Sequence, residues 1–433
     1  MLKKIIQYRL ERYVKQYFKS HPEIRLVAVT GSVGKTSTKF ATAKVLEQSF
    51  RVRYNSGNHN SELSAPIAIF GLEYPENIRD VSQWRKVFSQ MKQKISQPTD
   101  VDIIVQELGS DRIGQIPHFG TYLKPDISIV TAVSPEHMEY FKTIEAVAKE
   151  ELAIAGYSKQ VLVNGDDVDD KFMYLAKNKL INKYGVASTN DYYFSYDEYN
   201  LNKGYVGTIE ATELSKGFPA EIFVFGAHSI RPVVAAAAVG IKFGMKTEDI
   251  AKGISKIQPV SGRMNVLPGK NNTRLIDDTY NSSPLALKAA LDSLYNLSGQ
   301  NNIAVIGDMN ELGESSAREH EFIGSMCNPK EVFTVVTVGK MSRDFLAPAA
   351  TMKGCKVVSF DNSRQAGEYL QKNAPNGSTI LFKGSEGGIY LEEAVKSMLS
   401  STKLSERLVR QSPAWIKKKE NFFAKQANII SKQ

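Results

Sequence analysis

Hydrophobic residues recur along the first part of the chain in two spacings, one typical of strands and one typical of helices. Continuous apolar runs of strand length occur at 24–30, 101–108, 126–133 and 160–165. Helix-spaced apolar residues lie between them, at 35–48, 84–95 and 143–156. Buried strands that alternate with helices predict a mostly parallel sheet covered by helices. Beyond them, we expect an antiparallel patch at 190–225 and an alanine-rich helix at 229–243.

A second, shorter alternation begins near Ser261. Its apolar runs are TRLIDDTY, NNIAVIGD, VFTVVTVG, KVVSF and STILFKGS, with helical patterns at 284–297, 316–326 and 363–373. This pattern predicts a smaller doubly wound, Rossmann-like domain. We therefore expect an α/β protein with four parts: a basic amphipathic helix (1–24), a central domain (25–260), a Rossmann-like C-terminal domain (261–400) and a basic tail (401–433).

The N-terminal segment 2–19 is both amphipathic and basic. Apolar residues such as Ile6, Leu10 and Tyr13 recur at helical spacing, and lysines and arginines fill much of the rest. Such a helix either packs on the protein body or lies on a membrane surface. We favour packing, because core-facing helices are far commoner.

Composition and charge argue against several classes of protein. The 433 residues are 42% hydrophobic and 23% charged, as in a globular protein of two to three domains. We expect a cytoplasmic protein, since no signal peptide or membrane span is recognisable and the two cysteines lack CxxC spacing. Residues 1–25 carry +5 and residues 401–433 carry +6 of the total +9, so the body is not basic and we expect no nucleic-acid partner. The basic ends suit either an anionic membrane surface or an acidic partner. The first would place the protein peripherally at the inner face of the membrane. The alternative to both is that the basic ends only aid solubility.

A glycine-rich turn between a strand and a helix is the most informative segment. In VAVTGSVGKTSTK a buried strand runs directly into Gly31-Ser32-Val33-Gly34-Lys35-Thr36-Ser37, where a helix starts. The glycines let backbone N–H groups turn toward a phosphate, and the helix N-terminus favours negative charge. Lys35 supplies a positive charge for the β- and γ-phosphates, and the Thr36 hydroxyl can bind Mg²⁺. Val29 stands where the longer Walker A motif has glycine, so this is the shorter T-G-x-x-G-K-T-[ST] form of a P-loop, and we expect the central domain to bind ATP.

Glu107 stands at the end of a predicted buried strand, two residues before Gly109. The carboxyl ends of parallel strands are where α/β sheets bind their ligands. Together with Thr36, this carboxylate predicts Mg²⁺ coordination by hard oxygen atoms. The alternative is a structural role in capping a loop.

Several further segments resemble the Mur ligase superfamily and follow one another in the order found in that family. They are GNHNSELSAP, IIVQELGSDRIGQI, TAVSPEHMEYFKTIEAVAKEE, SGRMNVL, IDDTYNSSPLALKAAL, GDMNELGESSAREH and LFKGSEGG. The last four look most similar to the MurF-like members, which add D-alanyl-D-alanine. The resemblance covers roughly residues 25–400 and implies a ligase that uses ATP and Mg²⁺.

Three departures from the family pattern bear on function. Only about 24 residues precede the P-loop strand, so we expect the chain to lack the N-terminal UDP-binding domain of Mur ligases. In the family, a carbamylated lysine stands fourteen residues after the metal-binding histidine. In this chain the histidine is His137, and Glu151 stands fourteen residues after it. We predict that Glu151 supports the metal without carbamylation; the alternative is a solvated helix residue like its neighbour Glu150. Glu386 follows KGS where the family commonly has arginine, which leaves the amine substrate open.

The resemblance also implies roles for residues that the pattern alone leaves unassigned. His137 would bind a second Mg²⁺, although a single histidine is more often structural. Arg263 resembles the arginine that contacts the γ-phosphate. Residues of the second domain would face the nucleotide (Asp278, Asn281) or the incoming amine (Lys383, Ser385), and two more are expected to line the substrate cleft (Asn60, Asp308).

These observations predict an amide-forming ligase that works through an acyl-phosphate. We expect it to add an amino acid or dipeptide to a cell-wall muramyl-peptide precursor, either a small molecule or a lipid-linked one. Two alternatives stay open: another amide ligase of the superfamily, similar to folylpolyglutamate synthetase, or a nucleotide-binding regulatory or scaffold protein without turnover.

Overall fold

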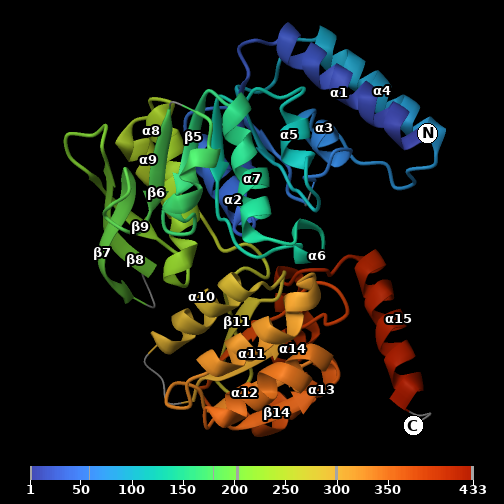
Figure 1. Ribbon diagram of the computed structural model, residues 1–433, viewed down its shortest axis with the longest axis vertical. Helices are drawn as coiled ribbons and strands as arrows, with labels where there is room; N and C mark the ends of the chain where they lie inside the picture. The colour runs from blue at the N-terminus through green and yellow to red at the C-terminus, as the bar shows by residue number, and fades with distance from the viewer. Residues whose placement is uncertain (1, 58, 179, 201–203, 298–300, 431–433) are drawn as a thin grey trace. The chain divides into compact units, whose positions relative to one another are not determined.

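The computed structural model describes residues 2–57, 59–178, 180–200, 204–297 and 301–430 (Figure 1). The chain forms two compact units. The first unit contains Met1–Ser134, Tyr140–Phe223 and Ser229–Gln258; the second contains Pro135–Glu139, Val224–His228 and Pro259–Gln433. No helix in the described ranges has both the length and the apolar character needed to cross a bilayer.

The first unit is built on a nine-stranded sheet in the order β2-β3-β1-β4-β5-β6-β7-β8-β9. Strands β2 to β7 pair in parallel, whereas β8 runs antiparallel to both β7 and β9. This confirms both the parallel sheet and the antiparallel patch expected from the sequence. The strands are β1 (Arg25–Thr30), β2 (Val52–Tyr54), β3 (Ile103–Glu107), β4 (Ile127–Val130), β5 (Gln160–Asn164), β6 (Ile181–Gly185), β7 (Tyr192–Asn200), β8 (Gly204–Ala211) and β9 (Phe218–Ile222).

Helices cover this sheet, and α2, α8 and α9 pack against one another (Figure 1). The predicted helix at 143–156 is α7 followed by a 3-10 turn at Ala153–Tyr157. The helix predicted at 84–95 begins earlier, at Val81, because the Asp80 side chain accepts a hydrogen bond from the Ser82 amide and caps it. The helices are α1 (Leu2–Ser20), α2 (Lys35–Leu46), α3 (Ser64–Ile69), α4 (Val81–Ser96), α5 (Gln115–Phe119), α6 (Met138–Phe141), α7 (Ile144–Leu152), α8 (Arg231–Lys242) and α9 (Thr247–Ser255).

The second unit has its own six-stranded sheet in the order β10-β11-β15-β12-β13-β14. All pairs are parallel except β10 with β11, so the expected doubly wound fold is confirmed and an antiparallel edge strand is added to it. The strands are β10 (Asn265–Pro268), β11 (Arg274–Asp278), β12 (Ile303–Gly307), β13 (Thr334–Val338), β14 (Val357–Phe360) and β15 (Thr379–Lys383). The helices are α10 (Pro284–Tyr295), α11 (Ser316–Met326), α12 (Ala347–Met352), α13 (Ser363–Asn373), α14 (Glu392–Met398) and α15 (Pro413–Ile430).

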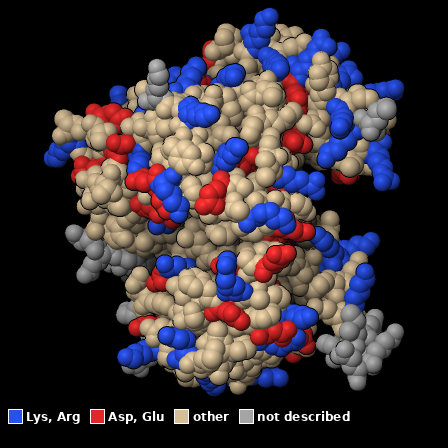
Figure 2. Space-filling view, in the orientation of Figure 1, with Lys and Arg blue, Asp and Glu red and all other residues tan. Residues whose placement is uncertain are grey.

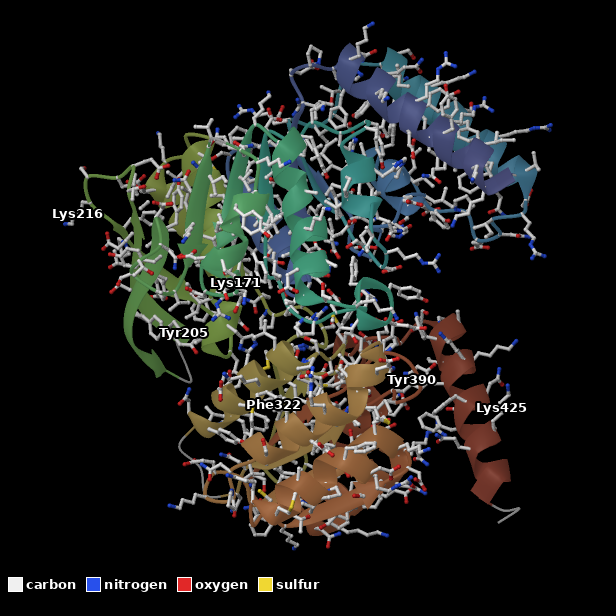
Figure 3. The ribbon with its side chains drawn as sticks, viewed as in Figure 1. Lys171, Tyr205, Lys216, Phe322, Tyr390 and Lys425 are labelled. Atoms are coloured by element: carbon white, nitrogen blue, oxygen red, sulfur yellow. The ribbon has the colours of Figure 1, made fainter. Side chains whose placement is uncertain are left out.

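The C-terminal helix α15 is anchored on the second unit by aromatic and ionic contacts. The ring of Tyr390 lies 5.1 Å from that of Phe422, and Figure 3 shows Tyr390 facing α15. Buried Lys419 lies 2.6 Å from Glu393 and 3.4 Å from Glu392. The basic tail predicted from the sequence therefore includes a docked helix.

Candidate active site

The glycine-rich turn forms an anion cradle between β1 and α2. Gly31 has φ 125° and Gly34 has φ 88°, values that L-residues rarely adopt. A Cβ on Gly31 would lie 2.3 Å from the Thr131 hydroxyl oxygen, so only glycine fits there. Gly34 caps α2 without any side-chain hydrogen bond, which leaves the first-turn amides for a phosphate.

The other residues predicted in this turn line the same cradle. The Lys35 ammonium folds back and donates to the Gly31 carbonyl oxygen. Ser32 is buried, and its hydroxyl lies 2.9 Å from that of Ser134. Val33 and Ser37 are half-buried.

Glu107 is the centre of a buried polar cluster beside the cradle. Parallel pairing places Glu107 next to Val29, one residue before the P-loop threonine. Its Oε2 accepts a hydrogen bond from the Thr36 hydroxyl at 3.1 Å, and its Oε1 accepts one from the Asn60 amide at 3.1 Å. The structure therefore brings together three residues predicted from separate segments of the sequence.

Lys39 completes this cluster and was not predicted from the sequence. Its ammonium lies 3.2 Å from Glu107 Oε2 and donates to the Gly57 carbonyl at 3.0 Å. Both charged side chains are almost fully buried, at 2% and 3% exposure. The signal was present in the sequence, because Lys39 stands four residues after Lys35, on the same face of α2.

The donor set fits Mg²⁺ in part. Thr36 and Glu107 offer two hard oxygen atoms, and Mg²⁺ typically takes its other ligands from water and phosphate. The described residues contain no group of three or more His, Cys, Asp or Glu side chains that could hold a metal ion by themselves. A metal at Thr36 and Glu107 would therefore be held jointly with the nucleotide.

Glu151 is buried and joins α7 to the P-loop. Its Oε2 accepts hydrogen bonds from the Thr30 hydroxyl at 2.5 Å and from the Gly31 amide at 2.8 Å. Its Oε1 accepts one from the Ser110 hydroxyl at 3.1 Å. The alternative of a solvated helix residue is therefore wrong for Glu151. A role in metal support stays a prediction.

Glu150, the neighbour used for comparison, is also buried. Its carboxylate accepts from the Gly114 and Ile116 amides, both at 2.7 Å, at the start of α5. Burial raises the pKa of this carboxyl, although these amides partly oppose the shift. Glu150 and Glu151 thus both hold neighbouring loops in place through hydrogen bonds, which the sequence pattern did not reveal.

His137 belongs to the short segment that groups with the second unit. Its Nδ1 lies 2.9 Å from Glu311 Oε2, and its Nε2 lies 3.8 Å from Glu136 Oε1. The hydrogen bond from His137 lowers the pKa of Glu311. The backbone of His137 has φ 48°, a strained conformation that is found more often at functional sites. Binding of a second Mg²⁺ by His137 stays a prediction.

In the second unit, Asp278 and Lys383 form a buried ion pair at the ends of β11 and β15. The Lys383 ammonium lies 2.6 Å from Asp278 Oδ2 and donates to the Asn281 carbonyl at 3.0 Å. Burial lowers the pKa of Lys383, and the Asp278 carboxylate opposes that shift. Three residues predicted from two separate motifs thus form one cluster.

The predicted arginine of the second unit stacks on an aromatic ring. The Arg263 guanidinium carbon lies 4.3 Å from the centre of the Tyr280 ring. Its buried Nε has no hydrogen-bond partner among the described residues. Because buried donors are almost always paired, this nitrogen is a candidate for contact with a ligand.

The remaining predicted residues, Asp308 and Ser385, are joined through their backbones. The Ser385 amide donates to the Asp308 carbonyl at 3.0 Å, and the Ser385 hydroxyl accepts from the Asn310 amide at 2.9 Å. The Asp308 carboxylate accepts from the Ser342 amide at 2.7 Å and from the Met341 amide at 3.3 Å. The structure therefore gives Asp308 a loop-fixing role, and its predicted contact with substrate stays a prediction.

Comparisons with known proteins identify a family and similar folds. The family model of the Mur ligase middle domain matches residues 29–240, and that of the Mur ligase glutamate ligase domain matches residues 262–386. A Bacillus subtilis relative, UDP-N-acetylmuramoyl-tripeptide--D-alanyl-D-alanine ligase, is 29% identical over 388 residues, covering 87% of this chain and 76% of its own. MurF from Acinetobacter baumannii has a similar structure, with a TM-score of 0.75 at 22% identity over 91% of this chain and 81% of that one. MurF ligase from Thermotoga maritima, solved with ADP, has a TM-score of 0.72 at 21% identity. The match covers 90% of this chain and 83% of that one.

Proposed function

Because the chain belongs to the Mur ligase family, we propose that it joins a muramyl-peptide carboxylate to the amine of an amino acid or dipeptide, with ATP as the energy source. The observation that carries this proposal is the cluster of Thr36, Glu107 and Asn60 beside the P-loop. The Bacillus subtilis relative is named for the addition of D-alanyl-D-alanine, which supports this dipeptide as the first amine to test. The Thermotoga maritima neighbour was solved with ADP, which supports an adenine nucleotide as a ligand of this chain.

In the first step, an oxygen of the substrate carboxylate attacks the γ-phosphorus of ATP. The bond from that phosphorus to the β–γ bridging oxygen breaks, which yields an acyl-phosphate and ADP. The P-loop amides and Lys35 hold the phosphates, and Arg263 is our proposed contact for the γ-phosphate. Its buried Nε has no hydrogen-bond partner within the described part of the chain, which supports that role. Positioning and charge neutralisation supply most of the catalysis, because the carboxylate and the phosphate are both anionic.

In the second step, the nitrogen of the amine attacks the acyl carbon. The resulting tetrahedral intermediate expels inorganic phosphate, which takes up the proton released from nitrogen. Lys383 and Ser385 are our proposed contacts for the amine. The Lys383 ammonium is anchored by Asp278 and Asn281, so its position is set before any substrate arrives.

Mg²⁺ would be held by Thr36 and Glu107, and it would neutralise charge on the transferred phosphoryl group. Lys39 neutralises Glu107 in the structure, which allows that carboxylate to be buried. We propose that Lys39 remains close when the metal binds and limits how strongly Glu107 attracts it. Glu151 supports this site indirectly, because its carboxylate accepts hydrogen bonds from Thr30 and Gly31 and so fixes the start of the loop.

The test is ADP release with purified protein, candidate carboxylates and candidate amines. UDP-linked and lipid-linked muramyl tripeptides should each be paired with D-alanyl-D-alanine and with single amino acids. We expect ADP to form only when a carboxylate and an amine are both present, and mass spectrometry should show one new amide per ADP. A Lys35→Ala variant is the negative control. ATP binding without turnover for any pair would instead support a regulatory or scaffold protein.

A further inference from the structure

Helices α1 and α4 lie side by side on the first unit, although sixty residues separate them in the chain (Figure 1). The Tyr13 ring lies 5.8 Å from the Phe88 ring, and the Arg9 guanidinium lies 4.3 Å from the same ring. Further along, a ring nitrogen of His21 lies 3.1 Å from the Lys94 carbonyl oxygen. The two helices therefore run parallel, with their N-terminal ends together.

The outer surface of this pair is basic. Nine lysines and arginines are exposed on the two helices: Lys3, Lys4, Arg9, Arg12, Lys15, Lys19, Arg85, Lys86 and Lys92. The sequence of α4 contains no acidic residue, and the only one in α1, Glu11, pairs with His118 at 2.7 Å. Helix α1 carries +5 and α4 carries +4, so the pair holds a charge equal to the +9 of the whole chain. Figure 2 shows these blue side chains gathered over the two helices.

Apolar side chains are exposed at the N-terminal end of the same pair. Ile5 and Tyr8 of α1 are 58% and 69% exposed. Val81 begins α4 and is 52% exposed, and Ile78 just before it is 53% exposed. The Trp84 indole donates a hydrogen bond to the Ile78 carbonyl at 2.9 Å, which holds the segment just before α4 against the helix. Four large apolar side chains thus project from one end of a strongly basic surface.

We propose that the α1–α4 pair docks on an anionic phospholipid bilayer. The lysines and arginines would contact lipid phosphates, and Ile5, Tyr8, Ile78 and Val81 would enter the boundary between headgroups and acyl chains. The buried side of each helix already packs on the protein, with Leu10, Val14 and Met91 fully buried. The exposed side is therefore presented on a preformed scaffold, and no helix has to fold on binding.

Lipid explains this surface better than nucleic acid does. A phosphate backbone would use the basic residues alone, whereas a bilayer uses the basic and the apolar residues together. The proposed ligase activity is independent of this inference, because neither helix carries a residue assigned to the reaction.

The experiment is vesicle co-sedimentation of the full chain, with phosphatidylcholine alone and with phosphatidylcholine plus phosphatidylglycerol. We expect binding only to the anionic vesicles, and we expect it to weaken as salt is raised. A Lys15→Ser, Lys19→Ser, Lys92→Ser variant should bind about 100-fold more weakly, since each basic residue near the surface contributes about 1 kcal/mol, or about fivefold. An Ile5→Ser, Tyr8→Ser variant should also bind more weakly.

The matched control removes three exposed lysines elsewhere on the same unit: Lys216, Lys246 and Lys252. Figure 3 shows Lys216 in the turn between β8 and β9, far from α1. This variant has the same net charge as the first and should bind the anionic vesicles nearly as well as the unmodified protein. Equal losses in the two variants would mean that only net charge matters and would overturn the proposal. So would failure of the unmodified protein to bind anionic vesicles.

Discussion

Replacing Lys39 with methionine tests the buried charge pair beside the P-loop. The change removes the ammonium 3.2 Å from Glu107 Oε2 and keeps a side chain of similar length. Breaking a buried ion pair by removing one partner costs about 3–5 kcal/mol, because it leaves the other charge buried. Glu107 retains the Thr36 hydroxyl and the Asn60 amide as donors, so we expect the lower end, about 3 kcal/mol.

Added Mg²⁺ and ADP should reverse part of this loss if Glu107 binds the metal. Without the lysine, the free carboxylate should hold Mg²⁺ at least about tenfold more tightly, which adds about 1.4 kcal/mol of stabilisation at saturation. The assay is urea unfolding followed by circular dichroism, with and without excess MgCl₂ and ADP. The gain from Mg²⁺ should be larger in Lys39→Met than in the unmodified protein.

Two further variants make the result interpretable. Lys44→Met removes a lysine from the same helix whose ion pair with Glu47 is solvent-exposed, so it should cost less than about 1 kcal/mol. A Lys39→Met, Glu107→Gln double variant should be more stable than Lys39→Met alone, because it leaves no buried charge unpaired. An identical gain from Mg²⁺ in Lys39→Met and the unmodified protein would refute the proposal that Lys39 limits Mg²⁺ binding at Glu107. An undiminished gain from Mg²⁺ in the double variant, which lacks the carboxylate, would refute metal binding by Glu107.

Three more predictions concern other buried polar groups. Glu151→Ala should weaken ADP binding more than Glu151→Gln in calorimetric titration, because it leaves the buried Gly31 amide unpaired at a cost of about 1–3 kcal/mol. Asp278→Asn should lower the free energy of unfolding by about 3 kcal/mol, and adding Lys383→Met should recover part of that loss; no recovery would argue against charge pairing as the cause. His320 is buried in α11, and this burial lowers its pKa. Its neutral form therefore stabilises the fold fully above the ordinary histidine pKa, and this stabilisation is lost as pH falls toward the pKa of the folded state. Urea unfolding between about pH 7.5 and pH 5.5 should thus show a smaller loss of stability in His320→Gln than in the unmodified protein.

Short-range patterns in the sequence were enough to predict the elements and the P-loop. The alternation of apolar runs with helical spacing reflects burial on sheet faces, and it predicted strands that became β1, β3, β4 and β5. Gly31 and Gly34 predict a turn with positive φ angles, and both residues have positive φ in the structure. The resemblance to the Mur ligases rested on motifs of this same short range.

Only the tertiary structure decided which distant residues became partners. Lys39 meets Glu107 because β1 pairs with β3, and Glu151 meets the start of the P-loop across a separation of 120 residues. The basic surface shows the same effect: the sequence located positive charge at the two ends of the chain, whereas the fold places α4 beside α1. Periodicity reports which face of an element is buried, but strand order and helix packing depend on contacts between segments far apart in the chain, and these leave no local signal.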